Sequence, residues 1–141
     1  MHVLKRALEI DAPATEVWRV LTTPELIREW ASAYLDGIQI RTSFREGESV
    51  TWKTSNGTTT SEGTVAACKP ERLLRFEYES DPRGTFSETY EIVPEEDRTW
   101  LKLTTGPLET ADFEALRGPA EQAIEEIKSL AEESAQIHGL R

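Results

Sequence analysis

The spacing of apolar and polar residues divides the chain into three parts. In the first part, apolar and polar residues alternate over residues 3–10, which predicts a strand. Two segments with helical spacing follow, one after Pro13 and one from Pro24 to Trp30. Thr23 precedes Pro24 and is expected to cap the second helix. The first part therefore predicts a strand followed by two short helices.

The second part, from about residue 36 to residue 106, consists of short β-favouring runs separated by turn signals. Asn56-Gly57 is the strongest hairpin signal, and residues 81–84 (DPRG) mark another turn. Tight turns between consecutive runs make neighbouring strands antiparallel. The expected strands cover about residues 38–43, 48–54, 60–68, 73–79, 85–93 and 99–105.

The last part is helical. Thr110 is expected to cap a short segment that ends at Leu116, and Pro119 is expected to open the main helix after a break at Gly118. One stripe of that helix is apolar and comprises Ala120, Ala123, Ile124, Ile127, Leu130, Ala131 and Ile137.

These elements predict an α+β fold. A curved antiparallel sheet of six to seven strands would carry two short helices after its first strand, with a long C-terminal helix packed across it. A single helix cannot fill the concavity of a strongly twisted sheet of this size. The remaining space must hold large side chains or remain open as a pocket.

Composition narrows the class of protein. A length of 141 residues with 38% hydrophobic and 30% charged residues fits one domain over residues 1–141. The net charge of −10 argues against nucleic-acid binding and against anionic membrane surfaces. Cys68 is the only cysteine, so no intrachain disulfide is expected. With neither a signal peptide nor an apolar run long enough for a membrane span, the sequence predicts a cytoplasmic protein.

Four motifs occur in a specific order along the chain. They are RALEIDAP at residues 6–13 followed by Val17-Trp18, LTTPE at residues 21–25 followed by Trp30, Gly63-Thr64-Val65 followed by KPERL at residues 69–73, and TWLKL at residues 99–103. In order and spacing they resemble the START-like, or SRPBCC, helix-grip (Bet v 1-like) superfamily. They most resemble the C-terminal-domain-like branch of homologues of the activator of the heat-shock-protein-90 ATPase.

The chain departs from this branch at two positions. The branch usually carries a Trp early in the last helix, where this chain has Ala120. The smaller side chain would enlarge any space beside it. The branch often closes its last strand with a His, where this chain has Thr104-Thr105. Chemistry that depends on that His is therefore not expected.

The predicted inner faces supply the candidate ligand-binding residues. Six aromatic side chains sit at positions that the pattern assigns to one inner face, and they would form either core packing or an apolar ligand wall, namely Trp30, Trp52, Phe76, Tyr78, Phe86 and Tyr90. Trp100 alternates out of phase and is expected on the outer face or an edge. Leu116, Ala120, Ala123, Ile124 and Ile127 would form the opposing wall on the helix. The widest part of a pocket is predicted under the first turns of that helix, facing Phe76, Tyr78 and Tyr90.

Two ionisable residues, Arg6 and Glu88, fall on the same inner face. Buried charges are costly unless they are paired or hydrogen-bonded. They are either polar anchors of the pocket or, after a one-residue slip in register, solvent-exposed side chains.

No catalytic or metal-binding pattern is present in the sequence. His2 and His138 lie at opposite ends of the chain without neighbours at ligand spacing, so neither a metal nor a cofactor is expected. The leading hypothesis is a binding module for a small apolar or amphipathic molecule of lipid or polyketide type. The resemblance implies a co-chaperone as one alternative, with a heat-shock-protein-90-type partner, and a cyclase-like enzyme using Glu88, Arg6, Tyr78 or Tyr90 as another. Monomer and homodimer both remain open.

Overall fold

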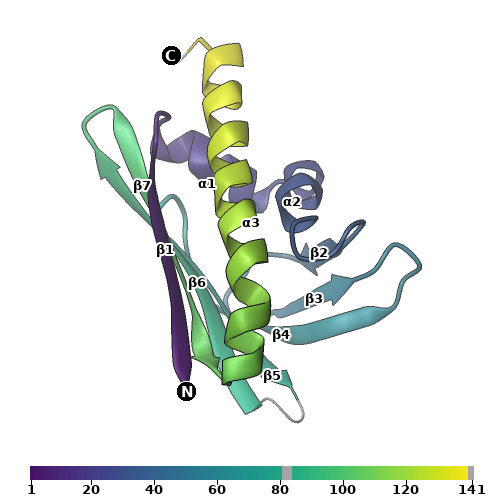
Figure 1. Ribbon diagram of the computed structural model, residues 1–141. Coiled ribbons are helices and arrows are strands. Elements are labelled where there is room, and N and C mark those ends of the chain that lie inside the picture. The colour runs from purple at the N-terminus through teal and green to yellow at the C-terminus, as the bar shows by residue number, and fades with distance from the viewer. Residues whose placement is uncertain (81–83, 140–141) are drawn as a thin grey trace.

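The computed structural model describes residues 1–80 and 84–139 and contains one antiparallel sheet with three helices (Figure 1). The seven strands lie in the order β1-β7-β6-β5-β4-β3-β2. The strands are β1 (His2–Ile10), β2 (Gln39–Thr42), β3 (Ser49–Lys53), β4 (Thr59–Lys69), β5 (Leu73–Ser80), β6 (Gly84–Glu95) and β7 (Arg98–Leu108). The predicted antiparallel meander is confirmed, and β1 completes it by pairing with β7. The turn expected at residues 81–83 lies outside the described residues.

The long helix α3 (Thr110–Ile137) crosses the concave face of the sheet, while α1 (Ala14–Thr22) and α2 (Pro24–Ala31) cover its upper end (Figure 1). This is the predicted helix-grip arrangement. The buried residues of α3 are Ala120, Ala123, Ile124, Ile127, Ala131 and Ala135. The predicted apolar stripe is thus confirmed over most of its length, but its last member, Ile137, is 73% exposed. No helix in the described part of the chain combines the length and the apolar character that a membrane span requires.

The predicted break in the C-terminal helix is wrong. The helix α3 is continuous through Gly118 and Pro119. A proline inside a helix removes one backbone hydrogen bond and crowds the residue before it, but Gly118 has no Cβ to be crowded. Packing of the apolar stripe on the sheet then keeps the helix intact. Thr110 begins α3 without capping it, and its hydroxyl instead lies 3.0 Å from Nε2 of His2.

Helices α1 and α2 are joined at Thr23, which occupies the N-cap position of α2 but forms no side-chain cap hydrogen bond, contrary to prediction. Pro24 at the first helical position sets the backbone there. Trp30 ties the two helices together, because its indole Nε1–H donates to the carbonyl oxygen of Val20 at 3.0 Å. The single polar group of the buried Trp30 side chain is therefore hydrogen-bonded.

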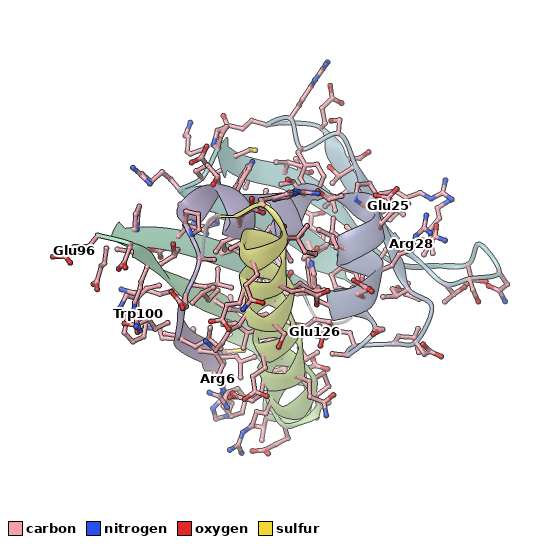
Figure 2. All side chains as sticks on the ribbon, turned by 90° about the horizontal axis from the view of Figure 1, so that it is seen from above. Arg6, Glu25, Arg28, Glu96, Trp100 and Glu126 are labelled. Atoms are coloured by element: carbon pink, nitrogen blue, oxygen red, sulfur yellow. The ribbon has the colours of Figure 1, made fainter. Side chains whose placement is uncertain are left out.

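The alternation along β5, β6 and β7 places large side chains between the sheet and α3. Leu74, Phe76, Tyr90 and Leu101 are at most 2% exposed. Trp100 alternates with these residues and lies on the side of the sheet away from α3 (Figure 2), as predicted.

The C-terminal end of α3 is fixed to α1 by a buried carboxylate. Glu16 accepts hydrogen bonds from Oγ of Ser134 at 2.6 Å and from Nδ1 of His138 at 2.9 Å. Arg19 donates from Nη1 to Nε2 of the same imidazole at 2.9 Å. Burial raises the pKa of Glu16, but the hydrogen bonds from Ser134 and His138 and the charge of Arg19 outweigh burial and leave the pKa below its usual value. These bonds fix the C-terminal end of α3 against α1. The space beneath the N-terminal end of α3 is bounded by the sheet.

Candidate functional site: a cavity beneath the start of the long helix

A cavity of about 250 Å³ lies between the sheet and the first turns of α3. Strands β1 and β3–β7 form its floor and sides, the segment between α2 and β2 covers one side, and α3 covers another. Its lining consists of Leu4, Tyr34, Leu35, Ile38, Trp52, Thr60, Ser61, Tyr78, Phe86, Glu88, Thr105 and Leu116. Most of this surface is apolar or aromatic, which is typical of small-molecule sites. An apolar cavity of about 150 Å³ holds benzene, so this volume suits roughly ten non-hydrogen atoms.

Tyr78 lies at the centre of one wall because its neighbour on β4 has no side chain. Gly63 pairs with Tyr78 across the two strands. A Cβ at Gly63 would lie 2.7 Å from Cδ1 of the Tyr78 ring and 2.1 Å from the carbonyl oxygen of Glu77. Glycine therefore allows the ring to lie against β4, where its hydroxyl accepts a 2.7 Å hydrogen bond from Nε1 of Trp52.

The aromatic walls are built from pairs of rings. Tyr78 stacks on Phe86 with 5.2 Å between ring centroids. Tyr34 meets Trp52 edge-on at 5.6 Å. Such contacts stabilise beyond simple burial and restrict ring rotation. The cavity therefore has defined walls before any ligand enters.

Glu88 is the only charged residue in the lining among the residues that the structure describes, and it is 6% exposed. It lies on β6 opposite Phe76 of β5 and Thr105 of β7. Its Oε1 accepts a 2.7 Å hydrogen bond from the hydroxyl of Tyr90, two residues further on the same face. Burial raises the pKa of Glu88 to about 7, and the bond from Tyr90 lowers it only in part. Near neutral pH this carboxyl can therefore gain or lose a proton.

Three tyrosine side chains interact electrostatically with this carboxyl. The pKa values of Tyr34, Tyr78 and Tyr90 are raised well above the usual tyrosine range, first by burial and then by the charge of Glu88. All three phenols therefore stay protonated at physiological pH and can donate hydrogen bonds. The described lining residues supply acceptors and neutral donors, but no positive charge.

The cavity adjoins a surface depression beside the start of β4, the end of β5 and the start of β6. Thr60, Ser61, Tyr78 and Phe86 also border this depression, which continues to Thr59, Glu62 and Glu79. Leu35 is 46% exposed beside this opening. The cavity thus deepens from an exposed rim to a buried base that includes Glu88.

The structure brings together only part of the predicted site. Five predicted residues line the cavity, namely Trp52, Tyr78, Phe86, Glu88 and Leu116. The cavity lies beneath the start of α3 and is lined by Tyr78. It does not lie beside Ala120, however, and Phe76 and Tyr90 do not face it.

The other apolar predictions fall within the packed core. The residues concerned are Trp30, Phe76, Tyr90, Ala120, Ala123, Ile124 and Ile127, each at most 2% exposed. They pack in the core between the sheet and the helices, and none of them lines the cavity beneath the start of α3. Tyr90 still acts on the site through its bond to Glu88.

Arg6 faces α3 as the alternation predicts, but it is not an anchor within the cavity. Its Nε lies 2.5 Å from Oε2 of Glu121 on α3, and a third of its side chain is exposed. Because β1 is an edge strand, a long side chain there can reach past the helix to water (Figure 2). The predicted anchor pair therefore reduces to Glu88.

Sequence reasoning missed the lining residues Leu4, Tyr34, Leu35, Ile38, Thr60, Ser61 and Thr105. The segment from Tyr34 to Ile38 carries three apolar residues outside any helix or strand. That pattern was the available signal, because an apolar loop must pack against something. Thr105 lies on β7, and its hydroxyl extends the polar part of the lining.

Among the described residues, no group of three or more His, Cys, Asp or Glu side chains is placed to hold a metal ion. No second carboxylate accompanies Glu88 among the described lining residues. The arrangement can bind an apolar body, hydrogen-bond to it through hydroxyls, and exchange one proton at Glu88.

The model of one protein family matches most of this chain. The family is described as Activator of Hsp90 ATPase homolog 1-like protein, and its model matches residues 11–132. The chain belongs to this family. The sequence resemblance to the activator branch is thereby confirmed. No curated protein matches the chain.

Solved structures of other proteins share the fold of this chain. Protein MLL2253 from Mesorhizobium loti is 19% identical, with a TM-score of 0.79, and the match covers 94% of this chain and 98% of that one. CalU16 from Micromonospora echinospora is also 19% identical, with a TM-score of 0.74 and coverage of 95% and 78%. The Aha1 dimer from Colwellia psychrerythraea is 16% identical, with a TM-score of 0.73 and coverage of 94% and 97%. At these identities the likeness establishes the fold alone.

Proposed function

We propose that this protein is a binding module for a small, largely apolar molecule. The observation that carries the proposal is the cavity of about 250 Å³, whose walls are mostly apolar and aromatic and whose base holds one buried carboxyl. A fully packed interior would be more stable, because an open cavity forfeits contacts between its walls. Occupation by a ligand restores those contacts. A cytoplasmic location belongs to the same proposal.

The test combines native mass spectrometry with a variant that fills the cavity. Protein purified without organic solvent is expected to carry a bound molecule or to take up propylbenzene, a compact apolar probe. Leu116→Trp places a large ring at the cavity wall and should abolish uptake. Ala115→Trp adds the same ring at the adjacent exposed position of α3 and should leave uptake intact. Both variants are checked for folding by circular dichroism.

Two results would contradict the binding function. One is a wild-type protein that carries no molecule and takes up no propylbenzene. The other is equal uptake by folded Leu116→Trp and wild-type protein, because the probe would then bind somewhere other than the cavity.

An enzymatic role is the second candidate, and Glu88 supports it. A carboxyl with a pKa of about 7 inside a cavity has the protonation behaviour of a general acid or base. One structural neighbour, DynU16, is described as a putative protein in the dynemicin biosynthetic locus. Incubating the co-purified molecule with wild-type protein and with Glu88→Gln separates the candidates, since only an enzyme changes its mass or isomeric form. The predicted heat-shock-protein-90-type partner rests on the family name and stays a prediction, which a pull-down would test.

A further inference from the structure

One oxygen of the Glu88 carboxyl is free and faces the cavity. Oε1 is engaged by the hydroxyl of Tyr90, whereas Oε2 has no hydrogen-bond partner within the described part of the chain. Every fully buried side-chain nitrogen or oxygen among the described residues has a partner. Oε2 therefore remains accessible, and the cavity that Glu88 lines is the space from which it is reached. A ligand group at that point meets an unsatisfied acceptor.

The surroundings of this oxygen specify what kind of group suits it. Among the described residues the lining contains no Lys, Arg or His, and the basic side chain of Arg6 is paired with Glu121 at the edge of the sheet. Four aromatic rings, those of Tyr34, Trp52, Tyr78 and Phe86, form the walls. A carboxylate together with aromatic rings is the combination that recognises ammonium groups. A ligand carboxylate would instead be repelled by Glu88 and find no cation in the lining.

We propose that the ligand is a small amine whose protonated nitrogen pairs with Oε2 of Glu88 and whose apolar body lies against the aromatic walls. This inference rests on the proposed binding function and narrows it, because fatty acids and other anionic lipids are excluded as preferred ligands. The net charge of −10 acts in the same direction, since it raises the local concentration of cations and lowers that of anions.

Binding of such a ligand should depend on pH in one direction. The titratable groups facing Glu88 are Tyr34 from the segment after α2, Tyr78 from β5 and Tyr90 from its own strand. All three are phenols that stay neutral, while β7 and α3 contribute only Thr105 and Leu116 to the lining. The pKa of Glu88 is about 7, so a cation binds the ionised form and gains affinity as pH rises. The expected gain between about pH 6 and about pH 8 is roughly tenfold.

The experiment compares three probes with the same number of non-hydrogen atoms: phenethylamine, phenethyl alcohol and propylbenzene. Binding is followed by NMR at the indole N–H signal of Trp52, which reports on the hydrogen bond to Tyr78. At about pH 8 the amine should bind at least roughly tenfold more tightly than the alcohol, as a charged pair outweighs a neutral hydrogen bond. Glu88→Gln should remove this preference, and Glu91→Gln, an equal charge change at an exposed position on the same strand, should retain it.

The possible outcomes distinguish failure of the amine proposal from failure of the binding function on which it rests. Failure of all three probes to bind would contradict the binding function itself. Binding of propylbenzene or the alcohol as tightly as the amine would leave the binding function standing and overturn the amine proposal. An amine affinity that does not rise with pH in the wild-type protein would overturn it as well, and this measurement needs no variant. Equal amine preference in a folded Glu88→Gln protein would also count against it.

Discussion

The buried carboxyl of Glu88 should make the stability of the free protein fall as pH rises. Its pKa is raised from an ordinary value of 4.5 to about 7 in the folded state. Below the lower pKa the carboxyl is protonated in both states and contributes no pH dependence to the free energy of unfolding. Between the two pKa values the carboxyl is ionised in the unfolded chain but protonated in the folded protein, so the free energy of unfolding decreases as pH rises. Above the folded-state pKa the folded protein holds an unpaired buried charge, and the free energy of unfolding decreases no further.

The size of this effect follows from the shift. A difference of one pKa unit corresponds to about 1.4 kcal/mol, so the full loss is about 3 kcal/mol. About 2.5 kcal/mol of it should fall between about pH 5 and about pH 8.5. Glu88→Gln cannot titrate at this position. The variant should therefore gain stability relative to the wild type by that amount across this range, on top of a constant offset from the new amide group.

The assay is urea unfolding of both proteins at several pH values, followed by tryptophan fluorescence. Subtracting the two free energies of unfolding at each pH removes the contribution of every other titrating group. Glu91→Gln, exposed on the same strand, controls for the change in net charge. A difference between wild type and Glu88→Gln that stays constant within about 0.5 kcal/mol would refute the reasoning, because a desolvated carboxyl cannot be independent of pH.

Three further substitutions test the framework around the site. Gly63→Ala should destabilise by about 2–4 kcal/mol in urea unfolding, because its Cβ would lie 2.1 Å from the carbonyl oxygen of Glu77; wild-type stability would show that the strands can separate there. Glu16→Gln should cost about 1–2 kcal/mol near neutral pH. Since its carboxylate has a lowered pKa, that deficit should vanish in acid, and a deficit that persists there would contradict the assignment. Trp52→Phe should cost about 1–2 kcal/mol by leaving the hydroxyl of Tyr78 without its donor, as measured by urea unfolding with circular dichroism; an unchanged midpoint would show that the bond contributes nothing.

Much of the fold could be predicted because each element has only one face to bury. Alternation along β5 and β6 identified the inner residues, and the positions of Leu74 and Phe76 confirm it. The failure at Pro119 has a different origin. Local rules describe an isolated helix, in which proline is costly, whereas packing on the sheet acts along the whole of α3.

The site was harder to predict because an inner position can belong either to the packed core or to the cavity. Tyr78 and Tyr90 both alternate inward, yet only Tyr78 lines the cavity. The difference depends on where α1 and α2 end along the sheet and on how residues 34–38 pack, and neither is encoded in strand periodicity. Glu88 could be placed on the inner face, and its partner Tyr90 follows from the spacing of two residues.

The position of Glu88 links stability to binding. A penalty of about 3 kcal/mol is large against the 5–15 kcal/mol that typically holds a folded protein together. An apolar side chain at the same point would avoid it, so the fold gains nothing from the carboxyl when the cavity is empty. A cation at Oε2 would pair with the ionised carboxylate and offset the free-energy cost of burying its charge. A bound amine should therefore stabilise the protein more at about pH 8 than at about pH 6, whereas a neutral ligand should stabilise it equally at both.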